Sequence, residues 1–407
     1  MATFSNMISV FLCLVFFVST GSRASYADDV ETKLTEYINL FSLDLFKTVS
    51  HDSDHAGNNL IMSAMSTDIE LAMLSLGADG ETHDEINKGL YLPNSGFTKG
   101  AYKPAIDKMN DYKHITVNLT NKVYVQVGKN NALDPLYKVY VTHLFGSEVE
   151  IIDFTQSKAA AAKINSWIED MTNHTVKDIV NPKDLDKETA IVLINTISFQ
   201  GKWEKKFNPH YTVKDVFYTS ADKEIQVDMM FQQNNFKYVE SSKLDAKMLE
   251  LNFEGNEMSM VFILPNEVDG LAALEDTLTK DYGKLKNMYD SLQTKFVTMY
   301  LPKFKIETTI HLEAALSNLG MSTMFSKKAD FSDLLVNDIP FKVDIVTQKA
   351  YIDINEQGVS AADSIILMID HVSKNHDNLF FADHPFCYGL VNSDGQIVLS
   401  GHFTGKQ

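Results

Sequence analysis

Three consecutive stretches near the C-terminus have the residue types of a functional loop. Residues 356–364 (EQGVSAADS) are mostly small, residues 365–379 (IILMIDHVSKNHDNL) mix apolar and polar types without a period, and residues 380–390 (FFADHPFCYGL) read as a dense apolar strand. This order predicts an extended loop of more than 20 residues that connects two strands. Loops of that length are uncommon in compact proteins unless they have a function.

The residue types that usually carry catalysis do not assemble into a recognisable site. The sequence contains no GxSxG, HExxH, GxxxxGK[ST] or CxxC motif. His371, His376 and Asp377 could be drawn as metal ligands. They lie in a polar stretch that reads as exposed, so we expect no metal. Cys387 lies in an apolar run and is interpreted as a buried small hydrophobe rather than a nucleophile. We therefore predict that the protein is not an enzyme and needs no cofactor.

The net charge of −18 limits the partners that the protein can have. Phosphate and sulfate groups are bound by clustered Lys and Arg, so this balance argues against nucleic acid and against heparin. The densest basic cluster, Lys202, Lys205 and Lys206, is interpreted as a solvated turn. After the first residues, no stretch approaches the roughly 20 apolar residues of a membrane span. We expect a soluble monomer.

Helices and strands are mixed along the chain. Helical spacing of apolar residues predicts an opening helix over 34–45, a strand and buried helix over 59–77, and an Ala-rich helix over 158–171. β-branched content predicts strands over 122–127 and 191–199.

From about Lys202 the sequence turns to short β-segments. They lie at 225–230, 258–264 and 296–306, and Asn392–Gly395 reads as a hairpin turn. This mixture predicts an α+β fold rather than a βαβ alternation.

The N-terminal residues are expected to be a signal peptide. Ile8–Val18 (ISVFLCLVFFV) has the length of a signal-peptide core, and small residues follow it. We expect cleavage after Ala24 or Ala27, so residues 1–27 form the signal peptide and 28–407 a single domain. The mature protein is then secreted and extracellular.

Two further features fit that compartment. Cys13 lies in the expected signal peptide, which leaves Cys387 alone and excludes an internal disulfide. The triplets that begin at Asn118 and Asn173 are sequons for N-glycosylation, and both are candidate sites.

The C-terminal strand carries a specific resemblance. Residues 380–390 resemble the C-terminal signature of the serpin family, with Asp383, Pro385 and Phe386 at its centre. Further serpin-like blocks occur in family order over nearly all of the mature chain: 59–82, 164–180, 195–209, 260–265, 301–307, 316–325, 329–334 and 348–358. The chain is identified as similar to serpins, which implies mixed β-sheets with surrounding helices and an exposed reactive-centre loop.

The resemblance implies a mechanism. Serpins are metastable: a protease cleaves the exposed loop, and the first half of the loop inserts into the main sheet before the acyl-enzyme hydrolyses. The protein would then be a suicide inhibitor of a serine protease. The region beneath which the sheet opens would include Asn59, Ser63, Ser66 and Trp203. Ala64 departs from the proline that the family usually has after Ser63.

Small residues should form the hinge from which insertion starts. The resemblance assigns this role to Glu356, Gly358, Val359, Ser360, Ala361, Ala362 and Asp363. Strand parity places Val359, Ala361, Asp363 and Ile365 on the face that would enter the core. Asp363 is a departure, because inhibitory serpins usually have a small neutral residue there. Burying its charge costs several kcal/mol, which would slow insertion.

The bond to be cleaved follows from a count along the loop. Fifteen residues from Gly358, inclusive, reach Val372, which makes Val372–Ser373 the expected reactive site and an elastase-like protease of the chymotrypsin fold the expected partner. A shift of two residues gives Lys374 and a trypsin-like partner. Leu367, Met368 or Ile369 would instead fit chymotrypsin-like or cysteine proteases.

Two other functions remain open at this point. Asp363 and Val359 are compatible with a serpin-fold protein that does not inhibit and serves as a carrier, storage protein or chaperone. An enzyme assembled from scattered residues has no support in the sequence.

Overall fold

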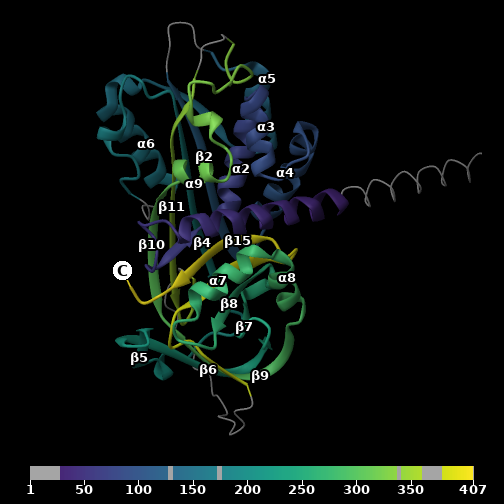
Figure 1. Ribbon diagram of the computed structural model, residues 1–407, viewed down its shortest axis with the longest axis vertical. Coiled ribbons are helices and arrows are strands. Elements are labelled where there is room, and N and C mark those ends of the chain that lie inside the picture. The colour runs from purple at the N-terminus through teal and green to yellow at the C-terminus, as the bar shows by residue number, and fades with distance from the viewer. Residues whose placement is uncertain (1–27, 127–131, 172–176, 337–340, 360–377, 407) are drawn as a thin grey trace, which may run out of the picture.

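The computed structural model describes residues 28–126, 132–171, 177–336, 341–359 and 378–406 (Figure 1). Most of its helices lie in the upper half of the molecule in Figure 1. The helices are the first helix, over residues 28–50, and α2 (Ala64–Ser75), α3 (Gly80–Gly89), α4 (Ser95–Asn110), α5 (Pro135–Leu144), α6 (Ser157–Met171), α7 (Leu271–Lys280), α8 (Tyr282–Asp290) and α9 (Glu313–Asn318).

The larger of two sheets has nine strands and runs through the lower half of the molecule in Figure 1. Its order is β1 (Leu60–Met62), β15 (Ile397–Phe403), β14 (Phe386–Asn392), β8 (Met258–Pro265), β7 (Ala246–Asn252), β6 (Lys223–Ser241), β9 (Gln293–Pro302) and β13 (Leu379–Phe381), with β5 (Val213–Ser220) paired to β6.

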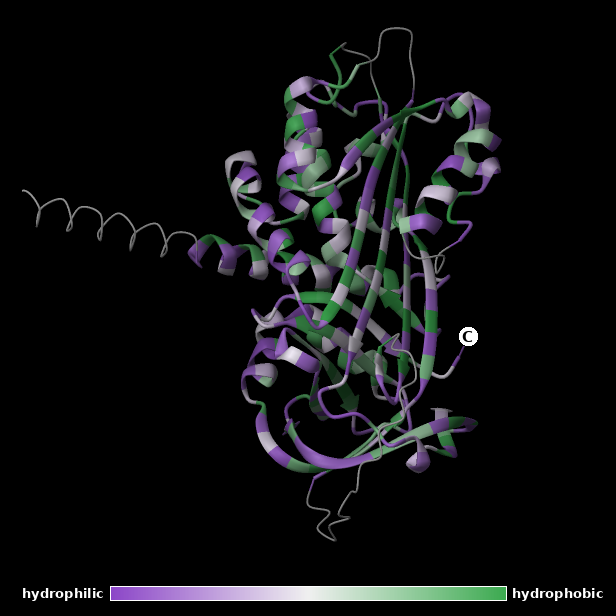
Figure 2. Cartoon of the chain, turned by 180° about the vertical axis from the view of Figure 1, so that it is seen from behind, coloured by the Kyte–Doolittle hydropathy of each residue, from purple (hydrophilic) through white to green (hydrophobic). Residues whose placement is uncertain are grey.

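The second sheet has six strands, and the described start of the expected functional loop, Gly358–Val359, belongs to it. Its order is β10 (Phe304–His311), β11 (Val343–Asn355), β12 (Gly358–Val359), β4 (Ile191–Lys202), β2 (Ile115–Gln126) and β3 (Glu148–Ile152). Figure 2 shows the long strands of this sheet running lengthwise across the molecule, with hydrophilic residues interspersed among hydrophobic ones.

Alternation along β4 lets the six-stranded sheet serve two cores. Leu193 and Ile197 belong to the main core, into which α2 packs, whereas Val192 and Ile194 point to the opposite side, where α6 covers the sheet. Successive side chains of a strand point to opposite faces, so the apolar run of β4 predicts burial on both. A third cluster lies between the pair α7–α8 and the outer face of β7, β8 and β14.

Helix α2 is enclosed along its whole length. All twelve of its residues are buried, and it begins at Ser63, whose hydroxyl accepts a hydrogen bond from the N–H of Ser66. This is the N-cap arrangement that serine favours. The helix therefore contributes almost nothing to the surface and acts as a central support for the strands above it.

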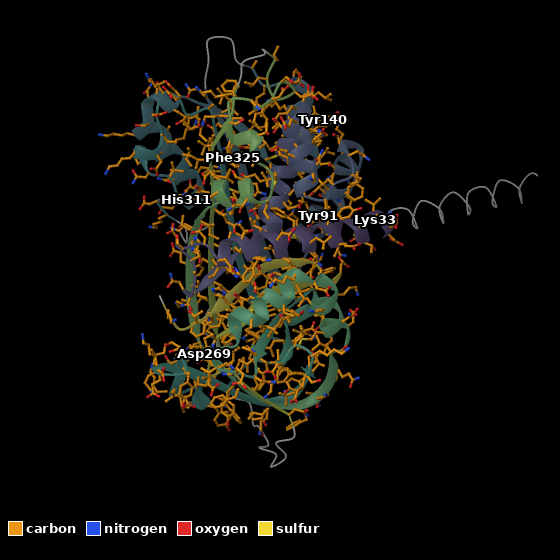
Figure 3. All side chains as sticks on the ribbon, viewed as in Figure 1. Lys33, Tyr91, Tyr140, Asp269, His311 and Phe325 are labelled. Atoms are coloured by element: carbon orange, nitrogen blue, oxygen red, sulfur yellow. The ribbon has the colours of Figure 1, made fainter. Side chains whose placement is uncertain are left out.

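The surface carries isolated contacts of ordinary kinds. Figure 3 shows Tyr140 on the outer side of the helical half, where the Nζ atom of Lys99 lies 4.3 Å from the centre of the tyrosine ring. Tyr91 donates a hydrogen bond of 2.5 Å to Asp44 of the first helix. Within the described ranges, no helix is both long and apolar enough to cross a membrane.

The expected α+β class is confirmed, and two expected segments change their limits. The predicted strand over 296–306 is two strands in different sheets, because the chain breaks pairing at Lys303 between β9 and β10. The segment predicted over 225–230 is part of β6, which extends from Lys223 to Ser241. The hairpin turn after Asn392 is present, with Gly395 in the left-handed region at φ +77°.

Gly401 permits close packing of β15 against β1. A Cβ atom at this position would overlap the carbonyl oxygen of Leu60 and lie 2.6 Å from the Tyr388 ring. We predict that Gly401→Ala lowers the free energy of unfolding by about 1–3 kcal/mol, because the backbone must shift to admit the methyl group. Urea unfolding measures the change.

The matched control is Gly100→Ala in α4, where a Cβ would meet nothing within 4 Å. This variant should raise stability by roughly 0.5–1 kcal/mol, as alanine does in a helix interior. Equal effects of the two alanines would contradict the packing explanation.

Candidate functional site

The functional site is built on a seam between two parallel strands. β11 pairs with β4 directly from Val343↔Ile191 to Tyr351↔Ser198. Beyond that point the chain turns back, and β12 lies between the same two strands, antiparallel to both. We call the β11–β4 pairing the seam. A strand that continued from β12 in the same direction would have to separate the seam pair by pair.

The turn that leads into β12 is fixed by backbone contacts. The N–H of Trp203 donates to the carbonyl oxygen of Gln357 at 2.9 Å, and its indole Nε1–H donates to that of Asn355, also at 2.9 Å. The indole is buried and stacks on Phe253, with ring centres 4.6 Å apart. Trp203 thereby holds both ends of the turn.

Gly358 is required where the chain enters the seam. Its φ is +153°, and a Cβ atom there would overlap the carbonyl oxygen of Gly201 on β4. A glycine is thus needed because the backbones of β12 and β4 approach more closely than a side chain allows. Val359, the next residue, is fully buried.

Glu356 clamps the outer end of the turn. Its carboxylate accepts a hydrogen bond from Thr212 at 2.8 Å and pairs with the Nζ atom of Lys303 at 2.9 Å. Burial acts to raise the pKa of Glu356, but the contacts with Lys303 and Thr212 outweigh it and hold this pKa below its ordinary value. The group is therefore an anion at neutral pH and links the turn to Lys303, between the two sheets.

A buried polar network joins the middle of the seam to α2. The two N–H groups of Gln348 Nε2 on β11 are shared among three acceptors: the carbonyl oxygen of Ser63 at 2.8 Å, Thr67 Oγ1 at 3.0 Å and Asn195 Oδ1 on β4 at 2.9 Å. Its Oε1 atom accepts from the N–H of Ser63 at 2.7 Å. One amide group thus connects both strands of the seam to the start of α2.

The same helix also holds the neighbouring strand. Ser66 Oγ donates to Asn121 Oδ1 of β2 at 2.9 Å, and Ser63 Oγ donates to the carbonyl oxygen of Val398 in β15 at 2.7 Å. The first turn of α2 is therefore bonded to β2, β11 and β15, while Asn195 of β4 bonds the same Gln348. Separation of β11 from β4 at Gln348 and Asn195 would break this network.

Comparison with known proteins identifies this arrangement. The family model described as "Serpin (serine protease inhibitor)" matches residues 36–405. The chain belongs to the serpin family. It is 38% identical to alaserpin of Manduca sexta, over 92% of this chain and 94% of the relative. It is 36% identical to antichymotrypsin-2 of Bombyx mori, over 86% and 92%.

A solved serpin has the same fold. The crystal structure of Serpin48 of the insect Tenebrio molitor superposes with a TM-score of 0.84 at 30% identity and covers 92% of this chain and 98% of that one. The serpin fold expected from the ordered sequence blocks is thereby confirmed.

The structure brings some of the predicted serpin residues together. Glu356, Gly358 and Val359 of the hinge lie beside Trp203, and Ser63 and Ser66 lie under the seam. Asn59 does not: its carboxamide oxygen binds the N–H groups of Thr404 and Gly405 near the C-terminus. The remaining predicted loop residues lie outside the described residues: Ser360, Ala361, Ala362, Asp363, Val372, Ser373 and Lys374.

The other candidates are placed as follows. Asn118 lies in β2, where its amide donates to Ser198 at 3.2 Å, and Asn173 lies outside the described residues, as do His371 and His376. Cys387 is buried, and burial, together with the nearby Glu275, raises the pKa of its thiol well above the ordinary value. Among the side chains that the structure describes, no three His, Cys, Asp or Glu residues are arranged to hold a metal ion.

Sequence reasoning missed the partners of the hinge and of the seam. Lys303 and Thr212 are far from Glu356 in the sequence, and although Lys303 lies in the serpin-like block 301–307, nothing there indicates a contact with Glu356. Asn195 did carry a signal, because it is an amide in a strand that is otherwise strongly apolar, whereas Gln348 lies among several polar residues of β11 and does not stand out.

Loss of the central amide should weaken the closed seam. We predict that Gln348→Leu lowers the free energy of unfolding by roughly 2–4 kcal/mol, because Ser63, Thr67 and Asn195 lose partners while they stay buried. Urea unfolding of the uncleaved protein gives the value. Gln233→Leu, which removes one hydrogen bond to Thr298 outside the seam, serves as the control and should cost less. A neutral Gln348→Leu would contradict the role of the network.

Proposed function

We propose that this serpin is a secreted suicide inhibitor of a serine protease, and that the chain after Val359 inserts between β4 and β11 once it is cleaved. The observation that carries the proposal is β12, whose two residues already pair antiparallel with both strands. Insertion would extend this pairing and would replace one parallel ladder by two antiparallel ones. Antiparallel pairing is the slightly more stable kind, and the inserted strand gains hydrogen bonds on both sides.

The chemical step belongs to the protease. Its serine hydroxyl attacks the carbonyl carbon of Val372, the bond to Ser373 breaks, and the new amino group leaves with the proton that the serine gave up. The acyl ester then joins protease and serpin until water hydrolyses it. Insertion that is faster than hydrolysis carries the protease to the far end of the sheet and distorts its active site.

The register of β12 predicts where the inserted residues would lie. Val359 pairs with Ile354 and Gly201, so continuation in step puts residue 361 opposite Ile352 and Phe199, and residue 363 opposite Ala350 and Ile197. Ile352, Phe199, Ala350 and Ile197 all belong to the main core. Asp363 would therefore enter an apolar layer.

Two residues further on, the same register reaches the polar network. Residue 365 would lie between Gln348 and Asn195, in place of the hydrogen bond that joins them. Ile365 offers no polar group to either amide. Insertion thus meets two successive barriers, one from the charge of Asp363 and one from the lost amide contact.

A covalent-complex assay tests the proposal. The mature protein is incubated with elastase-like, trypsin-like and chymotrypsin-like proteases, and the products are separated on denaturing gels. A band at the summed mass is expected with at least one protease, and mass spectrometry of the released fragment tests Val372–Ser373 against Lys374. Cleavage by every protease without such a band would overturn the inhibitor proposal.

Asp363→Ala should raise the fraction of protease that is trapped, because no charge has to enter the core. Ser360→Ala is its control, since residue 360 would lie opposite Asp353 and Gln200 on the solvent side of the sheet. It should change trapping little.

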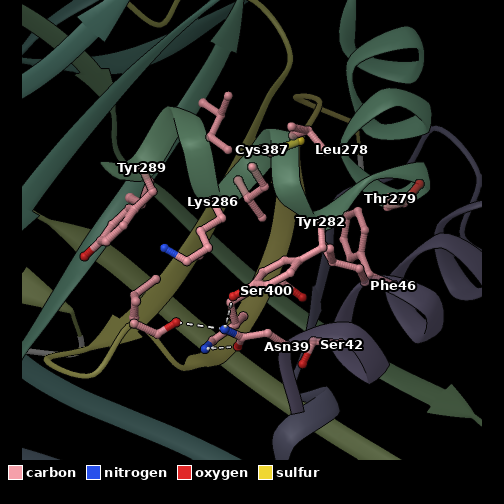
Figure 4. A pocket seen from close by; sticks show the side chains of 18 of the residues that line it. Asn39, Ser42, Phe46, Leu278, Thr279, Tyr282, Lys286, Tyr289, Cys387 and Ser400 are labelled. Atoms are coloured by element: carbon pink, nitrogen blue, oxygen red, sulfur yellow. Dashed lines mark hydrogen bonds between the residues drawn. The ribbon is translucent and has the colours of Figure 1, made fainter. Parts of the chain in front are cut away.

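One observation favours the alternative function, transport of a small molecule. A cavity of about 490 Å³ lies between the first helix, α7–α8 and the outer face of β8 and β14, and Figure 4 shows side chains from these elements around it. Drug-sized ligands occupy cavities of about 300–1,000 Å³. Its walls include Leu43, Phe46, Leu278 and Ile263, which suit an apolar molecule.

Gly389 in the floor of this cavity offers a direct test. A Cβ there would meet only the carbonyl oxygen of Leu399, at 3.4 Å, so a larger side chain would fill the cavity. If the protein is a carrier, the neutral dye Nile red should bind with enhanced fluorescence, and Gly389→Val should abolish this binding without loss of stability. Equal fluorescence of the two proteins would exclude the cavity as the binding site.

A further inference from the structure

Helix α2 carries two acidic residues inside the core. Asp68 and Glu70 are each 0% exposed, on a helix whose other residues are apolar or small and uncharged. Carboxylates are almost never fully buried unless they are paired. The two groups therefore need an explanation that the seam network, which starts at Ser63, five residues before Asp68, does not provide.

The partners of these carboxyl groups are few and carry no positive charge. Asp68 Oδ1 accepts a hydrogen bond of 2.5 Å from Tyr102 of α4, and its Oδ2 atom has no partner in the described structure. Neither side-chain oxygen of Glu70 has a hydrogen-bond partner of good geometry there, and the backbone of Ile194 makes a weaker polar contact with it. Tyr137 of α5 is the ionisable group that faces Glu70.

The other elements packed on α2 do not supply a counter-charge. Within the described residues, no ionisable side chain of α3, β2, β4 or β15 forms an ion pair or hydrogen bond with either carboxyl group. The backbone of Ile194 in β4 is the polar group of the sheet that faces Glu70.

An unpaired buried carboxyl group keeps its proton. Burial raises the pKa of Asp68 to about 7, and the hydrogen bond from Tyr102 offsets only part of the rise. Burial also holds the pKa of Glu70 well above its ordinary value, against a smaller opposite effect of the Ile194 backbone.

The position of the pair connects it to the seam. Ser63 and Thr67 of α2 bind Gln348, and the two carboxyl groups follow in the same helix, with Asp68 bonded to Tyr102 of α4 and Glu70 facing the backbone of β4. Ile194, which Glu70 faces, is paired with Thr347 in the seam itself. Motion that admits water between α2 and β4 would therefore hydrate Glu70 and weaken the seam at the same time.

We propose that Asp68 and Glu70 are a proton-operated lock beneath the seam: the sheet stays closed while both carboxyl groups hold their protons, and ionisation favours its opening. The lock acts on the closed sheet, so it does not depend on which protease, if any, the loop engages.

The sign of the effect follows from linkage. In the closed state the two groups bind protons more tightly than in water, so opening releases protons. The contribution of the two carboxyl groups to the stability of the closed seam is fully present below the ordinary carboxyl pKa. It is lost as the pH rises through the raised pKa of Asp68, about 7, and through the raised pKa of Glu70.

Hydrogen exchange followed by mass spectrometry tests the lock in the full mature chain. Protection factors, corrected for the intrinsic rate at each pH, are measured from about pH 5 to about pH 8 for peptides covering 191–199 and 343–351. Protection in the wild-type protein should fall with pH, by up to about tenfold per unit for each proton released. In the double variant Asp68→Asn, Glu70→Gln it should stay constant.

Internal and matched controls separate the lock from general loosening. A peptide covering 387–391 in the nine-stranded sheet should show no such fall, and Asp84→Asn, which changes a carboxyl whose side chain is 84% exposed, should behave as wild type. If the double variant does not fold, Asp68→Asn alone retains an acceptor for Tyr102 and should show a shallower fall. Flat protection in the wild type, or an unchanged fall in the variants, would overturn the proposal.

Discussion

The structure depends on one pairing, the direct parallel contact of β11 with β4. The two strands are buried in the middle of a sheet, yet nothing covalent and no long hairpin holds them in register. What keeps them together is the ladder itself, a cap of α6 on one face and the first turn of α2 on the other. The hinge at Gly358, the stacked Trp203 and the Glu356–Lys303 pair all lie at the one end of this pairing where another strand has already entered.

The choice of polar groups at the seam is a physical compromise. Apolar contacts alone would hold β11 and β4 together without fixing their register. The four hydrogen-bond contacts of Gln348 can form in one register only. Such a network is stable while complete and costly when one member is displaced. The seam therefore resists small displacements, and a partly open seam has few stabilising contacts. A segment with a stable closed state and no stable partly open state behaves as a two-state element.

Much of this could be predicted from the sequence, and the limits of the prediction have physical reasons. The fold class followed from ordered blocks, and the hinge from the short run EQGV, because both are local patterns. The division of 296–306 into two strands could not be predicted, since Lys303 interrupts pairing only because each half has a different partner strand. The partners of Glu356 were out of reach for the same reason: a contact across 144 positions, as with Thr212, leaves no local trace. Asp68 and Glu70 lie in a helix that was predicted to be buried, but that the side carrying their carboxyl groups is covered as well became evident only in the structure.

The thiol of Cys387 determines how two copies of the protein could become linked by a disulfide bond. In the described fold its side chain is largely buried, lies against Glu275 and forms part of the wall of the cavity between the first helix and α7–α8. Among the described residues there is no second cysteine, so no disulfide forms within that part of the chain. A second copy of the protein is too large to enter that cavity, so a disulfide-linked dimer would mark molecules whose nine-stranded sheet had come apart, and a non-reducing gel of an aged sample would detect them.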